Sequence, residues 1–133
     1  MKTHLQKLWC LNETIKSNMR DLENLRRLSK SIGGSNFEER TKGGERKNKL
    51  QDCVIKIVDL EREIEQQVSE YVAYKRKLIK AIDLHKDEKE RLLLRLRYIE
   101  YLTWEEISDK MNYSARQIYR LHKQALKNFE MRW

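Results

Sequence analysis

The stretch that decides the fold is "LTWEEISDKMNYSARQIYRLH", residues 102–122, because it contains two helix starts with the same double signature. Thr103 and Glu106 form a Thr-x-x-Glu capping box, and Ser114 and Gln117 form a Ser-x-x-Gln box. In each case two apolar residues take the positions of a hydrophobic staple around the cap, Leu102 with Ile107 and Tyr113 with Ile118. The sequence therefore predicts two helices in close succession.

The interval between the two caps leaves room for only a short first helix, from Trp104 to about Met111, with a turn near Asn112. Asparagine tolerates the left-handed backbone conformation that such a turn often needs. A short helix, a tight turn and a longer helix, with another helix in front, is the helix-turn-helix plan. The alternative is a plain helical corner that makes no contact with DNA.

The helix in front begins at Asp87, where Asp87 and Glu90 approximate a capping box, and is expected to run to about Tyr101. The leucines and isoleucine expected to face its core are Leu92, Leu93, Leu96 and Ile99. The following two helices offer apolar residues at helical spacing, namely Trp104, Ile107 and Met111, then Ile118, Leu121, Ala125 and Phe129. We expect residues 87–133 to form one small domain.

Residues 5–32 carry an earlier, coiled-coil-like pattern of three-four alternation, formed by Leu5, Leu8, Asn12, Ile15, Met19 and Leu22. Leu25, Leu28 and Ile32 continue the apolar face at looser spacing. Asn12 takes a core slot, where a polar residue can fix the register of two helices at some cost in stability.

Residues 46–84 show the same alternation at Leu50, Val54, Ile57, Ile64, Val68, Tyr71, Leu78 and Ile82. Glu61 and Lys75 occupy the two intervening slots, with Leu60 and Tyr74 beside them. All four glycines lie at 33–45, which predicts a hinge or a disordered loop there. We therefore expect an all-α chain in which residues 1–86 fold into an antiparallel helical hairpin. Pairing of these heptads with another chain is the alternative.

The composition favours a polyanionic partner, because 29 Lys and Arg stand against 21 Asp and Glu and give a formal charge of +8. The chain has no proline, as expected of an all-helical protein. We expect no membrane span, since no apolar run approaches ~18 residues, and no signal peptide. Cys10 and Cys53 are isolated, which favours reduced thiols inside a cell over a zinc site.

The last helix carries the candidate DNA-binding side chains on its polar face: Arg116, Gln117, Tyr119, Arg120, Lys123 and Lys127. In a helix-turn-helix the first residues of the second helix reach base edges in the major groove. Arginine can bond guanine bidentately, and glutamine can bond adenine in the same way. The alternative is a basic face that is only solvated.

Catalysis is not expected. His4, His85 and His122 are widely spaced, and no nucleophile–base motif, phosphate-binding glycine loop or cluster of metal ligands is visible. We therefore predict no cofactor and no metal.

The segment "LLRLRYIEYLTWEEISDKMNYSARQIYRLHKQALKNF" resembles the region-four helix-turn-helix of bacterial sigma factors. It is more closely similar to the sigma-like phage transcriptional regulators of the RinA and ArpU type. The resemblance implies a DNA-binding activator of phage late genes that works with host RNA polymerase in the cytoplasm of a bacterial host. It also implies that Arg97 contacts the DNA backbone, while Arg116, Gln117, Tyr119 and Arg120 face bases.

The chain also departs from sigma factors. Ala115-Arg116-Gln117 stands where they have a charged Arg-Glu-Arg run, so their target sequence cannot be transferred. No region that would bind a −10 element is present, so a complete sigma factor is not expected. Because a single helix-turn-helix makes limited contact with DNA, we expect a homo-oligomer. The alternative function is a helical interaction protein that binds RNA polymerase or a regulator and touches DNA only non-specifically.

Overall fold

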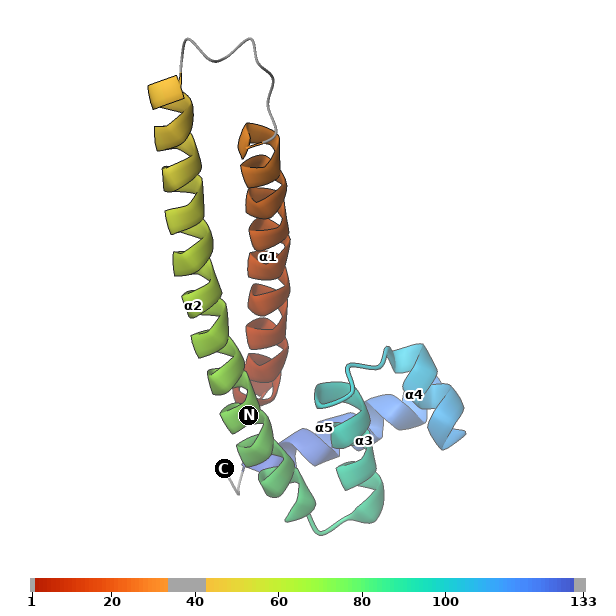
Figure 1. Ribbon diagram of the computed structural model, residues 1–133. Coiled ribbons are helices and arrows are strands. Elements are labelled where there is room, and N and C mark those ends of the chain that lie inside the picture. The colour runs from red at the N-terminus through yellow and green to blue at the C-terminus, as the bar shows by residue number, and fades with distance from the viewer. Residues whose placement is uncertain (1, 34–42, 131–133) are drawn as a thin grey trace. The chain divides into compact units, whose positions relative to one another are not determined.

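The computed structural model describes residues 2–33 and 43–130, and within them the chain folds into five helices and no strand (Figure 1). The helices are α1 (Lys2–Gly33), α2 (Gly43–Asp83), α3 (Glu88–Tyr98), α4 (Trp104–Met111) and α5 (Ala115–Glu130). The predicted fold class is confirmed, because α1 and α2 form a long hairpin and the short C-terminal helices pack together. The chain divides into two compact units, Glu13–Ser69 and Met1–Asn12 with Glu70–Trp133. Each unit is described by itself.

The two hairpin helices extend further into the glycine-rich segment than expected. Gly33 is the last residue of α1, and Gly43 and Gly44 open α2, although all three were assigned to a loop at 33–45. Glycine in a helix costs only about 1 kcal/mol relative to alanine, which the helix ends tolerate. The rest of that expected loop, residues 34–42, lies outside the described residues.

Arg46 explains why α1 can continue to its last glycine. Its Nε donates a hydrogen bond to the Ile32 carbonyl at 2.8 Å, and its Nη2 donates to the Gly33 carbonyl at 3.0 Å. The last carbonyls of a helix lack partners within the helix, and a cation there also compensates the negative end of the helix dipole. One side chain of α2 therefore closes the end of α1.

The seam between the helices in the unit Glu13–Ser69 contains Leu50, Ile57 and Ile64 of α2 as predicted, but Cys53, Leu60 and Gln67 take the slots expected at 54, 61 and 68. Cys53 is buried, whereas Val54 and Val68 are 45% and 42% exposed. The residues of α2 that are at least half-buried toward the seam are Leu50, Cys53, Ile57, Leu60, Ile64 and Gln67. The prediction was wrong at these three slots because valine is the more apolar choice at 54 and 68, whereas the alternation in the structure runs through 53, 60 and 67. Glu61 consequently leaves the seam and is exposed.

A similar correction holds for α1. Ile15 and Leu22 are buried as predicted, but Met19 and Leu28 are 55% and 52% exposed. Asn18 takes the slot expected for Met19, and its Nδ2 donates a hydrogen bond to Gln67 Oε1 across the seam at 2.9 Å. This amide pair is a polar contact of the kind expected to fix register, and Asn12, for which that role was predicted, is itself half-buried. Such a pair constrains register because any slip leaves two partly buried amides unpaired.

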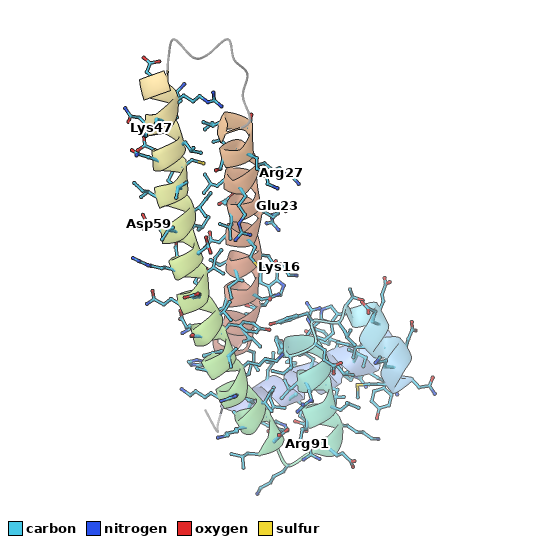
Figure 2. All side chains as sticks on the ribbon, viewed as in Figure 1. Lys16, Glu23, Arg27, Lys47, Asp59 and Arg91 are labelled. Carbon is cyan, nitrogen blue, oxygen red and sulfur yellow. The ribbon has the colours of Figure 1, made fainter. Side chains whose placement is uncertain are left out.

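The outer faces of the hairpin helices are charged. Figure 2 labels five of these exposed side chains, Lys16, Glu23 and Arg27 on α1 and Lys47 and Asp59 on α2. Glu23 and Arg27 form an ion pair at 2.8 Å with the i, i+4 spacing of neighbours on a helix. Since both side chains are exposed, the pair adds little to stability.

The unit formed by Met1–Asn12 and Glu70–Trp133 has two apolar clusters. The first joins the ends of the long helices to α3 and α5 through Leu5, Leu8, Leu78, Ile82, Leu94, Tyr98, Ile99, Ala125 and Phe129. The second joins α3, α4 and α5 through Leu93, Leu96, Ile107 and Ile118, with Leu102, Met111, Tyr113 and Leu121 packed against them. The predicted inward face of α5 is confirmed. In α3, however, Leu92 is 46% exposed and Leu94 is fully buried, because this helix is covered on two sides.

The helix α3 also ends earlier than expected, at Tyr98. Tyr101 takes a left-handed conformation with φ of 60°, and the Leu102 N–H donates to the Leu96 carbonyl at 3.0 Å. This closure satisfies a carbonyl in the last turn, as glycine-type helix ends do. It also turns the chain toward the start of α4.

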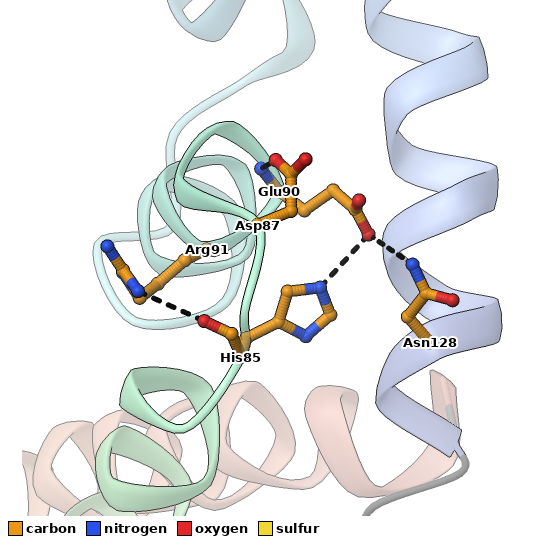
Figure 3. Close-up of polar contacts among 5 residues, drawn as sticks. All are labelled: His85, Asp87, Glu90, Arg91 and Asn128. Carbon is orange, nitrogen blue, oxygen red and sulfur yellow. Dashed lines mark hydrogen bonds and ion pairs between the residues drawn. The ribbon is translucent and has the colours of Figure 1, made fainter.

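The start of α3 is tied to α5 by a buried polar network (Figure 3). Glu90 is 4% exposed, and its Oε1 accepts hydrogen bonds from His85 Nε2 at 3.0 Å and Asn128 Nδ2 at 2.8 Å. Arg91 donates to the His85 carbonyl at 3.0 Å. Asp87 caps the Glu90 N–H at 2.9 Å, so half of the predicted capping box is present. The other half is absent because the Glu90 carboxylate turns to α5.

Leu92 and Leu94 offer a matched test of the two-sided packing of α3. Leu94→Ala should lower the free energy of unfolding by about 2–5 kcal/mol, since the side chain is fully buried. Leu92→Ala, on the exposed side, should cost less than about 1 kcal/mol. Urea unfolding followed by circular dichroism measures both. Equal losses would contradict the observed orientation of α3.

The amide pair of the hairpin predicts a coupled effect. Asn18→Leu should destabilise the chain by about 1 kcal/mol, because it leaves the Gln67 amide without its partner in the seam. Adding Gln67→Leu should restore most of the loss, because an apolar pair can replace a polar pair. A double-mutant cycle in urea measures the coupling, with Met19→Leu on the exposed side as control. Additive losses would show that the amides do not interact.

Candidate nucleic-acid interface

The first helix of the candidate interface, α4, begins with the predicted capping box. Thr103 Oγ1 accepts a hydrogen bond from the Glu106 N–H at 3.2 Å, and Glu106 Oε1 accepts one from the Thr103 N–H at 3.3 Å. Thr103 is extended, with φ of −70° and ψ of 160°, as an N-cap requires. Local chemistry therefore places the start of α4.

The second helix, α5, begins with the same arrangement. Ser114 Oγ accepts from the Gln117 N–H at 3.2 Å, and Gln117 Oε1 accepts from the Ser114 N–H at 2.8 Å. The prediction of a second box is confirmed. It also engages the oxygen of Gln117, one of the residues expected to read bases. A bidentate contact between Gln117 and adenine would compete with this hydrogen bond for the same oxygen.

The turn between α4 and α5 is closed by hydrogen bonds. Asn112 has φ of 57° and ψ of 43°, the left-handed conformation expected for it, and its N–H is directed at the carbonyls of Asp109 and Ser108. The Tyr113 N–H donates to the Ser108 carbonyl at 3.1 Å, and the Ser108 hydroxyl donates to the Tyr113 carbonyl. Both expected staple pairs lie in the same apolar cluster beneath the turn. These contacts fix the direction in which α5 leaves the turn.

The outward face of α5 is cationic. Arg116, Arg120, Lys123 and Lys127 are all exposed. At about 100° per residue they fall within an arc of about 60°. The opposite side of α5 carries the buried residues Ile118, Ala125 and Phe129. We call the four exposed basic side chains Arg116, Arg120, Lys123 and Lys127 the cationic face.

Tyr119 lies beside the cationic face rather than on it. It is 66% exposed and lines an open hollow of about 640 Å³ between α4 and α5. The other residues around this hollow are Trp104, Glu105, Ser108, Asp109, Ala115, Ile118 and His122. The two carboxylates of α4 make the flank next to Tyr119 less suited to phosphates than the cationic face.

Arg97, predicted to contact the DNA backbone, is half-buried and bound to its own chain. Its Nη1 donates to the Leu102 carbonyl at 2.9 Å, and its guanidinium lies 4.4 Å from the centre of the Trp104 ring. Trp104, expected in the core, is 37% exposed and makes an edge-on contact with His122 at 4.6 Å. Arg97 thereby supports the link between α3 and α4.

Tyr98 of α3 also contacts His122. Its hydroxyl and His122 Nε2 lie 2.6 Å apart, in a contact that ties α3 to α5. Burial raises the pKa of Tyr98 to about 12, so the phenol keeps its proton at physiological pH. Sequence patterns did not predict this contact, because its partners are far apart in the chain.

Residues 2–33 and 43–130 contain no helix long and apolar enough to cross a membrane. Within the same residues, no three or more His, Cys, Asp or Glu side chains are gathered so that they could hold a metal ion.

These helices define an all-α protein in which a long helical hairpin precedes a capped helix-turn-helix. A family model described as "Protein of unknown function (DUF1492)" matches residues 31–130, and the chain belongs to this family. The matched region includes all of α2 and the three C-terminal helices. No curated protein and no solved structure matches the chain.

The two capping boxes predict equal effects from single substitutions. Thr103→Ala and Ser114→Ala should each cost about 1 kcal/mol, because each removes the acceptor of a backbone N–H. Ser114→Asp should retain most of the stability, and Ser69→Ala in the middle of α2 serves as a control away from any cap. Thermal melts measure the four variants. No loss for either alanine variant would contradict the observed helix starts.

Proposed function

We propose that the chain is a sequence-specific double-stranded DNA-binding transcription regulator and that α5 is its recognition helix. The observation that carries this proposal is the cationic face, because all four basic side chains lie on the exposed side of the second helix of a capped helix-turn-helix. Exposed cations on that helix fit a groove lined by phosphates, and its first turns approach base edges. The net charge of +8 favours the same partner.

The position of each side chain along α5 suggests its part in binding. Arg116 lies in the first turn and Arg120 one turn later, so both are candidates for bidentate contacts to guanine. Lys123 and Lys127 lie further from the helix start and are assigned to phosphates. Gln117 contributes mainly to the helix cap.

The similarity to sigma-like phage regulators supports a finer proposal. In that reading the chain activates phage late genes with host RNA polymerase, in the cytoplasm of a bacterial host and as a homo-oligomer. The segment that carries the similarity includes α4 and α5. Genome-wide mapping of bound DNA in the host, with and without Arg116→Ala, tests whether bound sites lie at late promoters.

A helical interaction protein is the second candidate. It is favoured by the hollow beside Tyr119, whose aromatic and acidic lining suits basic protein side chains better than DNA. In this reading the hollow binds a polymerase subunit or a regulator, and the cationic face contributes only non-specific contact with DNA.

Binding isotherms separate the two candidates. A preferred duplex is first selected from random sequence, and affinity for it and for a scrambled duplex is measured at several salt concentrations. Arg116→Ala should cost about 1–3 kcal/mol on the selected duplex and reduce discrimination at particular bases. Lys127→Ala should weaken both duplexes about equally and lower the salt slope by about one.

Lys56→Ala on the hairpin provides the matched control, since Lys56 is an exposed cation outside α5. It should leave both affinities unchanged. If selection recovers no preferred duplex, or if Arg116→Ala and Lys127→Ala lose equally on both duplexes, the face is merely basic. The interaction protein would then be the better account.

A further inference from the structure

A hollow of about 310 Å³ lies where the beginning of α1, the end of α3 and the start of α4 meet. All of its lining residues belong to the unit formed by Met1–Asn12 and Glu70–Trp133. Four of the six are aromatic, and they include two of the chain's three tryptophans. We call this hollow the aromatic pocket, and its lining is Gln6, Trp9, Arg97, Tyr98, Tyr101 and Trp104.

The two tryptophans of the aromatic pocket are left open to solvent by the fold. Trp9 is 49% exposed and Trp104 is 37% exposed, whereas Leu5 and Leu8 beside Trp9 on α1 are fully buried. Neither tryptophan belongs to the two apolar clusters of this unit. Packing of the described residues therefore does not account for two large rings around one hollow. Aromatic side chains gathered in a concave site are typical of ligand sites.

Tyr101 supplies another ring from a strained backbone. Its φ of 60° lies in the left-handed region, where a bulky residue is an outlier and glycine or asparagine would be less strained. Its hydroxyl lies 3.0 Å from the hydroxyl of Tyr71, a contact that holds the ring in place. The ring packs against the cluster that contains Phe129 and also lines the pocket. Because strain of this kind concentrates at ligand sites, the ring rather than the turn explains a tyrosine here.

Arg97 holds a positive charge at a fixed position in the pocket lining. Its Nη1 donates to the Leu102 carbonyl and its guanidinium lies against the Trp104 ring, so the side chain is oriented before any ligand binds. A guanidinium has five N–H donors, so this one hydrogen bond leaves others for a ligand. In the part of the chain that the structure describes, Arg97 forms no ion pair. Glu100 and Glu105 neighbour lining residues in the chain, but both are exposed and neither lines the pocket.

The lining distinguishes between classes of ligand. A cation would be attracted by the ring faces but repelled by Arg97, and no carboxylate in the lining offsets that repulsion. An aliphatic ligand would leave the donors of Arg97 and the amide of Gln6 unpaired. A planar ring that carries an anionic group satisfies both features, because bases stack on aromatic side chains and guanidinium pairs with phosphate. We propose that the aromatic pocket binds one nucleotide, with its base against the aromatic rings and its phosphate on Arg97.

Two features favour a nucleotide over a smaller aromatic acid. The amide of Gln6 carries donors and an acceptor, the groups that pair with the edge of a base. The volume of about 310 Å³ lies at the lower end of the range for ligand sites, which suits one nucleotide rather than a dinucleotide. The nucleotide comes either free from solution or from an unpaired stretch of nucleic acid. Because the pocket does not involve the cationic face, this assignment goes beyond the proposed function and can fail separately from it.

Titration of the full-length chain tests the ligand class, with AMP and GMP as probes because their purine rings offer a large face for stacking. Both should bind in the millimolar range or more tightly. Adenosine lacks the phosphate and ribose 5-phosphate lacks the base, so each should bind at least about tenfold more weakly than AMP. Calorimetry measures the affinities. Nuclear magnetic resonance should show shifts of the indole N–H signals of Trp9 and Trp104, which line the pocket.

Two substitutions separate the base contact from the phosphate contact. Trp9→Ala should weaken AMP and adenosine equally, by about tenfold, because it removes a stacking surface that both ligands use. Trp9→Phe, which keeps a ring, should restore most of the affinity. Arg97→Gln should weaken AMP by about tenfold or more and leave adenosine unchanged, because only the phosphate contact is lost. Unchanged adenosine binding also shows that the pocket has kept its shape.

Leu92→Ala and Arg95→Gln on α3 provide matched controls. Leu92 is 46% exposed, close to the exposed fraction of Trp9, and lies outside the pocket. Arg95 is a half-buried arginine on the same helix as Arg97, and its Nη1 lies 3.3 Å from Asp83 Oδ1. Both variants should keep the affinities of the unmodified chain for AMP and adenosine.

A single-stranded deoxyadenylate of about four nucleotides separates the two sources of the nucleotide. If the pocket takes its nucleotide from a strand, this oligonucleotide should displace AMP at a lower concentration than AMP itself, and Trp9→Ala should abolish the advantage. If the nucleotide is free in solution, the oligonucleotide should displace AMP no better than AMP does. Comparison with Trp9→Ala removes any binding of the oligonucleotide to the cationic face.

Three results would overturn the proposal. A lack of binding by both AMP and GMP at millimolar concentration would exclude a nucleotide from the pocket. Ribose 5-phosphate that binds as tightly as AMP would reduce the pocket to a general anion site. Equal loss of AMP affinity in Trp9→Ala and Leu92→Ala, or in Arg97→Gln and Arg95→Gln, would place the nucleotide elsewhere on the chain.

Discussion

The packing of the three C-terminal helices depends on α3, which is buried on two sides. Leu94 and Tyr98 contribute to the cluster that contains Phe129, and Leu93 and Leu96 contribute to the cluster beneath α4. A helix with one apolar stripe could hold only one neighbour, whereas adjacent leucines point in directions about 100° apart and hold two. The arrangement of α4 and α5 therefore follows from the apolar run in a helix of eleven residues.

Polar contacts then fix what the apolar clusters leave free. Apolar packing tolerates some rotation of one helix against another, whereas hydrogen bonds are directional. Glu90 joins Asn128 of α5 to His85, and Tyr98 joins His122 of the same helix. Because these partners lie on α5, their contacts limit its rotation about its own axis. The cationic face stays turned outward for that reason, and this orientation is what binding to DNA would require.

The features predicted most reliably from the sequence are those that depend on residues close together in the chain. Both capping boxes, both staples and the left-handed Asn112 follow from neighbours within a few residues and are confirmed. Some slots of the hairpin seam were predicted wrongly, since Cys53 and Gln67 look like weaker core residues than the valines that follow them. The contact of Glu90 with Asn128 was missed because its partners lie on different helices, and the contacts of Arg97 were missed because they depend on the turn at Tyr101 that brings Leu102 and Trp104 back toward α3. The sequence therefore predicted which helix carries the candidate site, but not the hydrogen bonds and ring contacts that its side chains make within the chain.

The capping role of Gln117 bears on how specificity could arise. Its Oε1 already accepts the Ser114 N–H at 2.8 Å, so reading adenine would compete with this half of the capping box, while Ser114 Oγ would still accept the Gln117 N–H. A good bidentate base contact contributes about 1–3 kcal/mol, and the competing hydrogen bond lowers what Gln117 could add. Arg116 and Arg120 are exposed and hold no part of this cap. Under the proposed function, discrimination between DNA sequences should therefore come mainly from contacts to guanine by these two arginines, with Gln117 holding the helix start in place.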